Sequence, residues 1–263
     1  MTRIISVVNQ KGGVGKTTTA VNMATALAAI GKQVLVIDLD PQGNASTGLG
    51  ITQEQRLKTS YDVLIGAATL EESAVKTEIP RLSVSPATID LTGAEIELVG
   101  MEQREYQLKH ALADMPHHWD YALIDCPPSL GLLTINALTA SDAVLIPLQC
   151  EFYALEGLSH LLKTIRLVQV NLNPMIAIHG VVLTMYDRRN KLTEQIEEDV
   201  RGFLGTDVYK TVIPRNVRMS EAPSHGKPAL VYDLKCSGSQ AYLSLARELI
   251  QREKAFAAQH AAA

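Results

Sequence analysis

Apolar runs separated by helical patterns are the main regularity along this chain of 263 residues. Several runs are apolar at nearly every position, which is typical of strands buried on both faces of a sheet. Seven segments of this kind predict strands: Ile4–Val8, Val34–Ile37, Leu82–Val84, Tyr121–Ile124, Ala143–Ile146, Ile176–Leu183 and Val208–Val212.

Between these runs, apolar residues recur at helical spacing with charged residues between them. This spacing predicts helices over Thr17–Ile30, Ala94–Leu112, Ala154–Val170, Thr193–Phe203 and Gln240–Phe256. Alternating strands and helices favour an α/β fold, a doubly wound and mainly parallel sheet with helices on both faces. Ligands of such folds bind at the carboxyl ends of the strands.

The chain is expected to form a single domain over residues 1–263, because α/β folds of this length often share one core. Residues 51–80 are the least regular and predict short helices over the sheet edge. The Ala-rich end, residues 255–263, predicts a frayed tail.

Composition places the chain among globular proteins, with 46% hydrophobic and 20% charged residues. Its three cysteines, Cys126, Cys150 and Cys236, lie far apart and form no C-x-x-C pair, which argues against disulfides, zinc and iron–sulfur clusters. No apolar run is long enough to span a membrane, and the amino terminus lacks a signal-peptide pattern. A cytoplasmic protein is therefore expected.

The formal net charge of −4 argues against nucleic-acid binding by bulk electrostatics. The distribution of charge is uneven, because residues 185–263 hold 12 basic against 10 acidic residues and the rest holds 12 against 18. Any surface for a polyanion is therefore expected to be a local patch in the C-terminal third.

A glycine-rich loop stands between the first predicted strand and the first predicted helix. Glycines let backbone N–H groups converge on one point, and the helix that follows adds the positive end of its dipole. In such a phosphate-binding loop Lys16 reaches the β- and γ-phosphates, and the Thr17 hydroxyl binds Mg²⁺. The sequence thus predicts a nucleoside triphosphate and Mg²⁺ as ligands, with nucleotide-binding residues Gly12, Gly13, Val14, Gly15, Lys16, Thr17 and Thr18.

Carboxylates end two further predicted strands. Asp38 and Asp40 flank one leucine after the second strand, so both side chains can face the same side of an extended chain. Asp125 ends the apolar run from Tyr121, the Walker B pattern, and is expected to hold Mg²⁺ through a water. Hydrolysis needs an in-line water and positive charge on the transferred phosphoryl group. Lys16 and Mg²⁺ are expected to supply this positive charge.

The run Thr211–Pro228 is a polar loop leading into a short helix, and Met185–Asn190 is a second polar segment. Each carries an arginine of interest, Arg218 and Arg189. By themselves, two separated arginines are more typical of a solvated surface than of a binding site.

These four motifs, in this order, resemble the ParA/MinD ATPases with a deviant Walker A loop, and the Soj branch is the most similar. The resemblance extends from Ile4 to about Leu249. It implies that Lys11 crosses a dimer interface to the other subunit's phosphates and that Asp40 positions the attacking water. It also implies that Asp38 lies near the Mg²⁺ shell, that Pro214 and Asn216 border the adenine, and that Arg189 and Arg218 bind DNA.

The family resemblance implies a switch driven by ATP. In the ATP state two chains form a homodimer around two nucleotides, and this dimer binds double-stranded DNA without sequence preference. A ParB-like centromere-binding protein stimulates slow hydrolysis, which releases the DNA. The resemblance therefore implies a nucleoid-associated protein that segregates chromosome or plasmid DNA.

Three alternatives remain open on the sequence. A MinD-like membrane ATPase shares the loop, but residues 247–258 interrupt a basic helical face with glutamates and dilute the apolar face with alanines. No stable membrane association is therefore expected. A metabolic ligase or reductase component on the same fold is a second alternative. A GTPase is a third, although Asn190–Thr193 lacks the aspartate that reads guanine.

Overall fold

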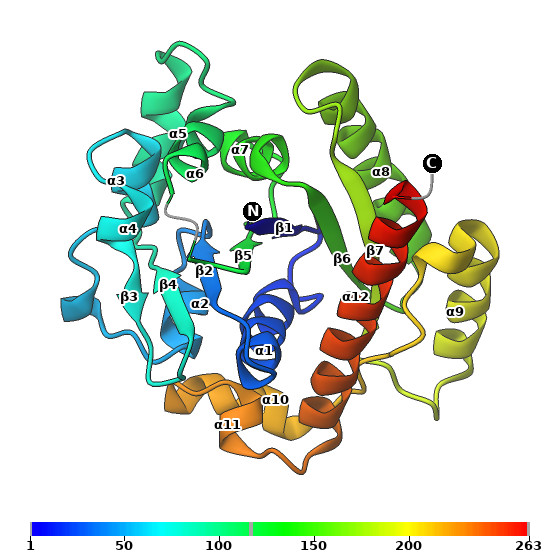
Figure 1. Ribbon diagram of the computed structural model, residues 1–263. Coiled ribbons are helices and arrows are strands. Elements are labelled where there is room, and N and C mark those ends of the chain that lie inside the picture. Colours follow the sequence, from blue (N-terminus) through cyan, green and yellow to red (C-terminus); the bar gives the residue numbers. More distant parts are fainter. Residues whose placement is uncertain (1, 116–117, 262–263) are drawn as a thin grey trace.

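A seven-stranded sheet forms the centre of the computed structural model, which describes residues 2–115 and 118–261 (Figure 1). The strand order is β3-β4-β2-β5-β1-β6-β7, and every pairing is parallel except that of β3 with β4. The strands are β1 (Arg3–Val7), β2 (Val34–Asp38), β3 (Val75–Lys76), β4 (Leu82–Ser85), β5 (Tyr121–Asp125), β6 (Ala143–Gln149) and β7 (Ala177–Thr184).

Helices cover both faces of this sheet, as the sequence predicts (Figure 1). One face packs against α1, α2, α11 and α12, and the other against α5, α6, α7 and α8. The α-helices are α1 (Lys16–Ala29), α2 (Asn44–Gly48), α3 (Ser60–Leu64), α4 (Leu70–Ser73), α5 (Leu91–Val99), α6 (Gln107–Ala113), α7 (Leu132–Ala140), α8 (Ala154–Asn171), α9 (Lys191–Leu204), α10 (Val217–Glu221), α11 (Ala229–Tyr232) and α12 (Ser237–Ala261). Short 3-10 turns are η1 (Gln53–Gln55), η2 (Gly205–Asp207) and η3 (Ala222–His225).

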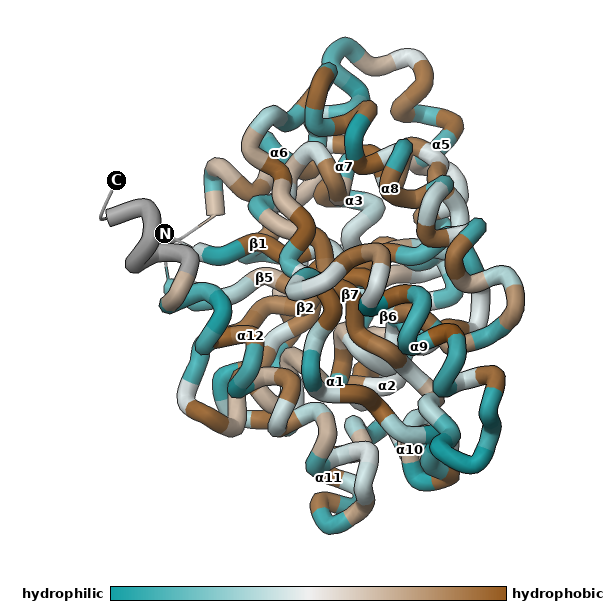
Figure 2. The backbone as a smooth tube through the Cα atoms, turned by 90° about the vertical axis from the view of Figure 1, so that its right-hand side faces the viewer, coloured by the Kyte–Doolittle hydropathy of each residue, from teal (hydrophilic) through white to brown (hydrophobic). Residues whose placement is uncertain are grey.

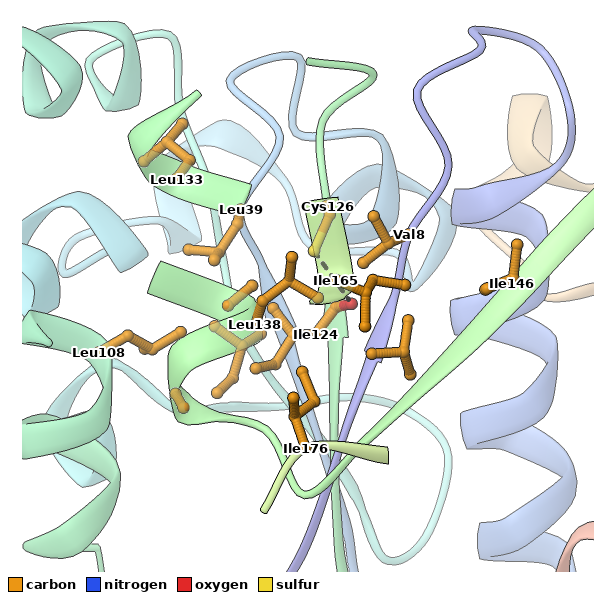
Figure 3. Packing of buried hydrophobic residues seen from close by; sticks show 14 of the residues in the cluster. Val8, Leu39, Leu108, Ile124, Cys126, Leu133, Leu138, Ile146, Ile165 and Ile176 are labelled. Carbon is orange, nitrogen blue, oxygen red and sulfur yellow. Dashed lines mark hydrogen bonds between the residues drawn. The ribbon is translucent and has the colours of Figure 1, made fainter. Parts of the chain in front are cut away.

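Alternate residues of the central strands pack into two separate hydrophobic cores, one on each face of the sheet. In β2, for example, Leu35 and Ile37 face one core while Val34 and Val36 face the other. This period of two follows from strand geometry, and burial on both faces explains why the runs are apolar throughout. Figure 2 shows the resulting band of hydrophobic backbone through the middle of the molecule. Figure 3 shows one core at close range, where Ile124 and Leu138 lie among other aliphatic side chains.

Six of the seven predicted strands are confirmed within three residues at each end, and Val208–Val212 is wrong. Only Val208 makes an isolated bridge, to Val181. The backbone N–H groups of Lys210 and Thr211 instead donate to the Glu248 carboxylate at 2.8 and 2.9 Å. A side chain of α12 thus takes the donors that a strand ladder would need.

Two further element predictions need correction. The expected helix Ala94–Leu112 is two helices, α5 and α6, because α5 ends at Val99 with Gly100 as its cap and Gln103 adopts a left-handed φ of 51°. In the irregular region 51–80, the expected short helices are present together with the edge strand β3. The sequence prediction also missed α7. At the carboxyl end α12 continues through Ala261, where a frayed tail was expected from residue 255, and residues 262–263 lie outside the described part.

The carboxyl ends of β1, β2 and β5 meet at one edge of the sheet. The register pairs Val7 with Asp125 and Asp38 with Asp125 across the neighbouring strands. The glycine-rich loop, the two strand-end carboxylates and the segment after β2 therefore come together there, as the fold class predicts.

Candidate functional site

The loop between β1 and α1 has the backbone of a phosphate cradle. Gly13 and Gly15 adopt left-handed φ values of 78° and 86°, which glycine reaches without steric cost. Gly15 caps α1, so the loop delivers the free N–H groups of a helix N-terminus to one point. Thr184 of β7 fixes the loop by donating its hydroxyl to the Val14 carbonyl at 2.8 Å. The Val14 side chain is itself buried, so this residue can contribute only its backbone.

The two lysines of the loop have different surroundings. Lys16 is 7% exposed, and its Nζ donates to the Lys11 carbonyl at 2.9 Å. Burial lowers the pKa of Lys16, while the charges of Asp125, Cys126 and Asp40 oppose this change. Lys11 instead turns its ammonium group to Glu151, just beyond β6, and forms an ion pair within the same chain.

One cavity of about 380 Å³ unites the loop with the segment after β2. Lys16, Thr17, Thr18 and Asp40 line it together with the backbone of Gly12, Gly13 and Gly15. Gln42, Asn44, Pro128 and Met185 complete the wall. The structure thus brings together residues predicted to bind phosphate and the residue predicted to position water. Lys11 is not among the lining residues.

The two carboxylates after β2 differ in environment. Asp40 lines the cavity, and its Oδ1 accepts the Gln42 N–H at 3.0 Å. Asp38 is fully buried, and its Oδ2 accepts both the N–H and the hydroxyl of Ser46, at 2.8 and 2.7 Å. Burial raises the pKa of Asp38 to about 6 against these hydrogen bonds. Asp38 therefore anchors the start of α2, and the structure does not test its predicted place near Mg²⁺.

Asp125 is the least satisfied polar group of this edge. Both carboxylate oxygens are buried, and neither accepts a hydrogen bond from the described residues. Burial raises the pKa of Asp125 well above its usual range, and the charge of Asp38 adds to the rise. The Thr17 hydroxyl and the Lys16 ammonium oppose this rise from nearby, but neither makes a hydrogen bond to the carboxylate.

Buried carboxylate oxygens without donors fit a hard cation that prefers oxygen ligands. Thr17 and Asp125 are the residues that would hold Mg²⁺, directly or through water. When bound, Mg²⁺ would supply positive charge to the β- and γ-phosphates. The chain itself supplies the Lys16 ammonium, the backbone N–H groups of the loop and the Asp40 carboxylate.

A second cavity of about 220 Å³ adjoins the first and shares Gly15, Thr18 and Met185 with it. Pro214 and Asn216, which are predicted to border the adenine, line this second cavity. The Asn216 side chain already has partners, because Oδ1 caps α10 at 2.9 Å and Nδ2 donates to Ser237 at 2.9 Å.

The two predicted DNA-binding arginines reach solvent but already have carboxylate partners. Arg189, with a side chain 88% exposed, makes a bidentate pair with Asp187. Arg218, 51% exposed, lies 2.8 Å from Glu221 and 3.6 Å from Asp233. A phosphate group must exchange with these carboxylates to bind, so the proposed contacts remain predictions.

The sequence analysis missed several residues that the structure places at the site. Gln42 and Asn44 line the cavity, and their position in the polar run after Asp40 was a usable signal. Glu151, the partner of Lys11, lies 140 residues further along the chain and had no such signal. Met185, which lines both cavities with a left-handed φ of 49°, gave none either.

A mainly parallel sheet, a glycine loop leading into α1 and an aspartate at the end of β5 define a P-loop nucleoside triphosphatase. Residues 2–178 match the family described as an AAA domain. The chromosome partitioning protein ParA of Caulobacter vibrioides is 62% identical over 96% of this chain and 95% of its own length. The sporulation initiation inhibitor protein Soj of Bacillus subtilis is 57% identical over 95% and 98%, respectively. The chain therefore belongs to the ParA/Soj family of partitioning ATPases.

Solved structures share the fold. Cobyrinic acid a,c-diamide synthase from Mycobacterium smegmatis, with bound ADP and magnesium, has a TM-score of 0.85. It is 38% identical, and the match covers 97% of this chain and 96% of that one. Its name indicates a metabolic enzyme, but the Caulobacter ParA and Bacillus Soj relatives are more similar in sequence. Within residues 2–115 and 118–261, no helix combines the length and apolar character needed to cross a membrane.

Proposed function

We propose that this chain is an ATP-dependent switch for DNA partitioning, built as a single domain over residues 1–263. With ATP and Mg²⁺ bound, two copies pair around two nucleotides and bind double-stranded DNA without sequence preference. Hydrolysis separates the copies and releases the DNA. In the cell, the protein is cytoplasmic and associates with the nucleoid in its ATP state.

The position of Lys11 is the observation that carries the proposal. Its ammonium group does not line the cavity of its own chain, and Lys16 already serves that cavity. Lys11 is 48% exposed at the loop and pairs with Glu151. An exposed cation beside a phosphate site can complete a second copy's site when two such edges face each other. Since only the triphosphate offers the γ-phosphate charge, pairing depends on ATP.

Each residue of the site has a distinct role in the proposed reaction. Lys16 and the loop N–H groups hold the phosphates, while Thr17 and Asp125 hold Mg²⁺, with Asp38 near its shell. Asp40 orients the attacking water, which is a positioning role typical of phosphoryl transfer. Pro214 and Asn216 border the adenine. Basal turnover is slow because these parts are complete only in the paired state.

We expect DNA binding because pairing of two copies doubles a weak basic surface made of Arg189 and Arg218. Each copy contributes Arg189 and Arg218, and pairing brings two sets onto one face. Phosphate contacts give affinity without sequence information, so binding falls steeply with salt. A ParB-like centromere-binding protein is the partner that accelerates hydrolysis.

The coupling is tested first at the level of pairing. We expect sedimentation to show a dimer with ATP and a monomer with ADP for the wild-type chain. Lys11→Ala should stay monomeric in both, whereas Lys76→Ala, an exposed lysine on β3, should behave as wild type. ATP-driven pairing that survives Lys11→Ala contradicts the proposed switch.

The DNA step is tested by gel shift on duplexes of unrelated sequence with ATP, ADP and no nucleotide. We expect a shift with ATP alone, and its loss in the Arg189→Glu/Arg218→Glu variant with hydrolysis retained. Arg247→Glu, an exposed arginine of α12, is the matched control. Equal binding in all three nucleotide states would remove the coupling, and co-sedimentation with anionic liposomes would favour the MinD-like alternative.

A further inference from the structure

Arg56 is a buried arginine that the site description has not used. It follows η1 in the irregular region and is only 7% exposed. Its Nη1 donates to the Ala87 carbonyl at 2.9 Å. Its Nη2 donates to the Thr47 hydroxyl at 2.8 Å and to the Ile51 carbonyl at 2.9 Å. A buried guanidinium group with three such partners holds its surroundings in a fixed geometry.

These partners belong to the segment that carries Asp40. The Thr47 hydroxyl donates to the Gly43 carbonyl at 3.1 Å, and the Gly43 N–H donates to the Asp40 carbonyl at 2.8 Å. Gly43 has a left-handed φ of 61°, and a Cβ there would stand 2.4 Å from Arg56 Nη1. Arg56 is therefore packed directly against the turn that follows Asp40.

A second branch leads from Arg56 to the other strand-end carboxylate. Ala87, whose carbonyl accepts from Arg56, donates its own N–H to the Ser46 hydroxyl at 3.1 Å. Ser46 in turn donates to Asp38 at 2.7 Å. Burial lowers the pKa of Arg56, and the charge of Asp38 opposes this change. Hydrogen bonds through Ala87 and Ser46 thus connect the guanidinium group of Arg56 to Asp38. Hydrogen bonds through Thr47 and Gly43 connect it to Asp40.

We infer that Arg56 is a positioning residue for ATP hydrolysis, one that holds the segment from Asp38 to Ile51 so that Asp40 meets the attacking water. The inference rests on the proposed role of Asp40. Arg56 does not line the phosphate cavity, so its loss should change the position of the attacking water rather than the affinity for ATP. Small displacements at a reacting centre reduce turnover strongly, by up to about 100-fold.

The test compares Arg56→Lys and Arg56→Ala with the wild-type chain. We expect Arg56→Ala to lower kcat by about 10- to 100-fold with a KM for ATP within about threefold of wild type. Arg56→Lys keeps the positive charge but loses the planar guanidinium group with its several N–H donors. Its kcat should therefore lie between those of wild type and Arg56→Ala. Hydrogen exchange of residues 40–51 should accelerate in both variants. Millimolar guanidinium should restore part of the kcat of Arg56→Ala.

Arg252→Ala is the matched control, because Arg252 also donates to a buried backbone carbonyl, that of Val208, at 2.8 Å. It belongs to α12 and lines neither cavity of the nucleotide site. We expect it to lower the unfolding midpoint without changing kcat per folded molecule and without rescue by guanidinium.

Two results would overturn the inference. One is a wild-type kcat in Arg56→Lys. The other is a loss in Arg56→Ala that only tracks its folded fraction and that guanidinium does not rescue. Asp40→Ala separates this failure from failure of the proposed function, because wild-type turnover in Asp40→Ala would contradict the role of Asp40 whatever Arg56 does.

Discussion

Buried charged groups have few partners at the carboxyl ends of the parallel strands (the carboxyl edge) and several partners at their amino ends (the amino edge). At the carboxyl edge, Asp125 has no hydrogen bond among the described residues, and the Lys16 ammonium donates to the backbone carbonyl of Lys11. At the amino edge, Glu253 of α12 accepts from Arg3 at 2.8 Å and from Tyr121 at 2.6 Å. Polar groups of the amino edge are therefore satisfied by one another.

The amino edge extends this pairing through a second layer. His179 of β7 lies 3.7 Å from Glu253 and shares a 2.6 Å hydrogen bond with the hydroxyl of Tyr209. The ring of Tyr209 also stacks under Arg252, at 4.0 Å from its centroid. An unpaired buried charge costs folding free energy, whereas a completed network stabilises. The paired groups of the amino edge therefore stabilise the fold, whereas the charged groups of the carboxyl edge remain available to bind a ligand.

The largest effect should come from removing the phosphate lysine. Lys16→Ala deletes the ammonium group of the cavity, so turnover should fall by about 100-fold or more. Lys32→Ala, which removes a lysine 3.9 Å from Asp120, should leave turnover unchanged. The measurement is phosphate release at saturating ATP and Mg²⁺. Comparable losses in both variants would show that the two lysines do not differ as proposed.

Asp125→Asn should separate function from stability. It removes a Mg²⁺ ligand, so we expect turnover to fall by about 10- to 100-fold. It also removes a buried charge that lacks hydrogen bonds, so the free energy of unfolding without ligand should rise by about 1 kcal/mol. Denaturant unfolding of the nucleotide-free protein checks the second part. Asp142→Asn, beside Arg3 at the other edge, is the control, and a less stable Asp125→Asn would contradict the comparison.

Glu253→Ala should show the reverse pattern at the amino edge. It leaves Arg3, Tyr121 and His179 without their shared acceptor, so the free energy of unfolding should fall by about 2 kcal/mol. Turnover per folded molecule should not change. Glu71→Ala, an exposed glutamate of α4, should alter neither quantity. A turnover defect in Glu253→Ala would mean that the two edges are coupled.

The smallest effect is the pH dependence of this network. Burial raises the pKa of Glu253, but interactions with His179, Tyr121 and Arg3 outweigh it, so the pKa lies below the usual 4.5. The folded chain then binds fewer protons than the unfolded chain, and the stabilisation is present above pH 4.5 and is lost as pH falls through the lowered pKa. The advantage of wild type over Glu253→Gln should therefore shrink in acid. Unfolding free energies of both proteins across this range test the sign.

Local signals in the sequence were sufficient for most of the fold. Buried strands such as Val34–Asp38 are apolar at nearly every position because both faces are covered, and this leaves little ambiguity. The segment Val208–Val212 was also predicted as a strand, but Glu248 accepts the N–H groups of Lys210 and Thr211 within it. Such competition depends on a side chain from a distant helix, so no local pattern reveals it.

The candidate site shows the same division. Lys16, Asp40 and Asp125 could be predicted because a loop and two strand ends carry recognisable residue types. Glu151 and Arg56 could not be predicted, because neither belongs to a motif. Their roles depend on contacts with residues distant in the chain, Lys11 for Glu151 and Ala87 for Arg56.

The sequence by itself determined the alternation of strands and helices, the phosphate loop and the chemistry placed at the strand ends, because these depend on neighbouring residues and on periodicity. The tertiary structure alone decided which charges are paired. It gave Glu253 its donors, left Asp125 without any among the described residues, turned Lys11 to Glu151 and closed Arg56 over the Asp40 segment. Hydrogen bonds and burial depend on distance in space, and only the folded chain fixes those distances.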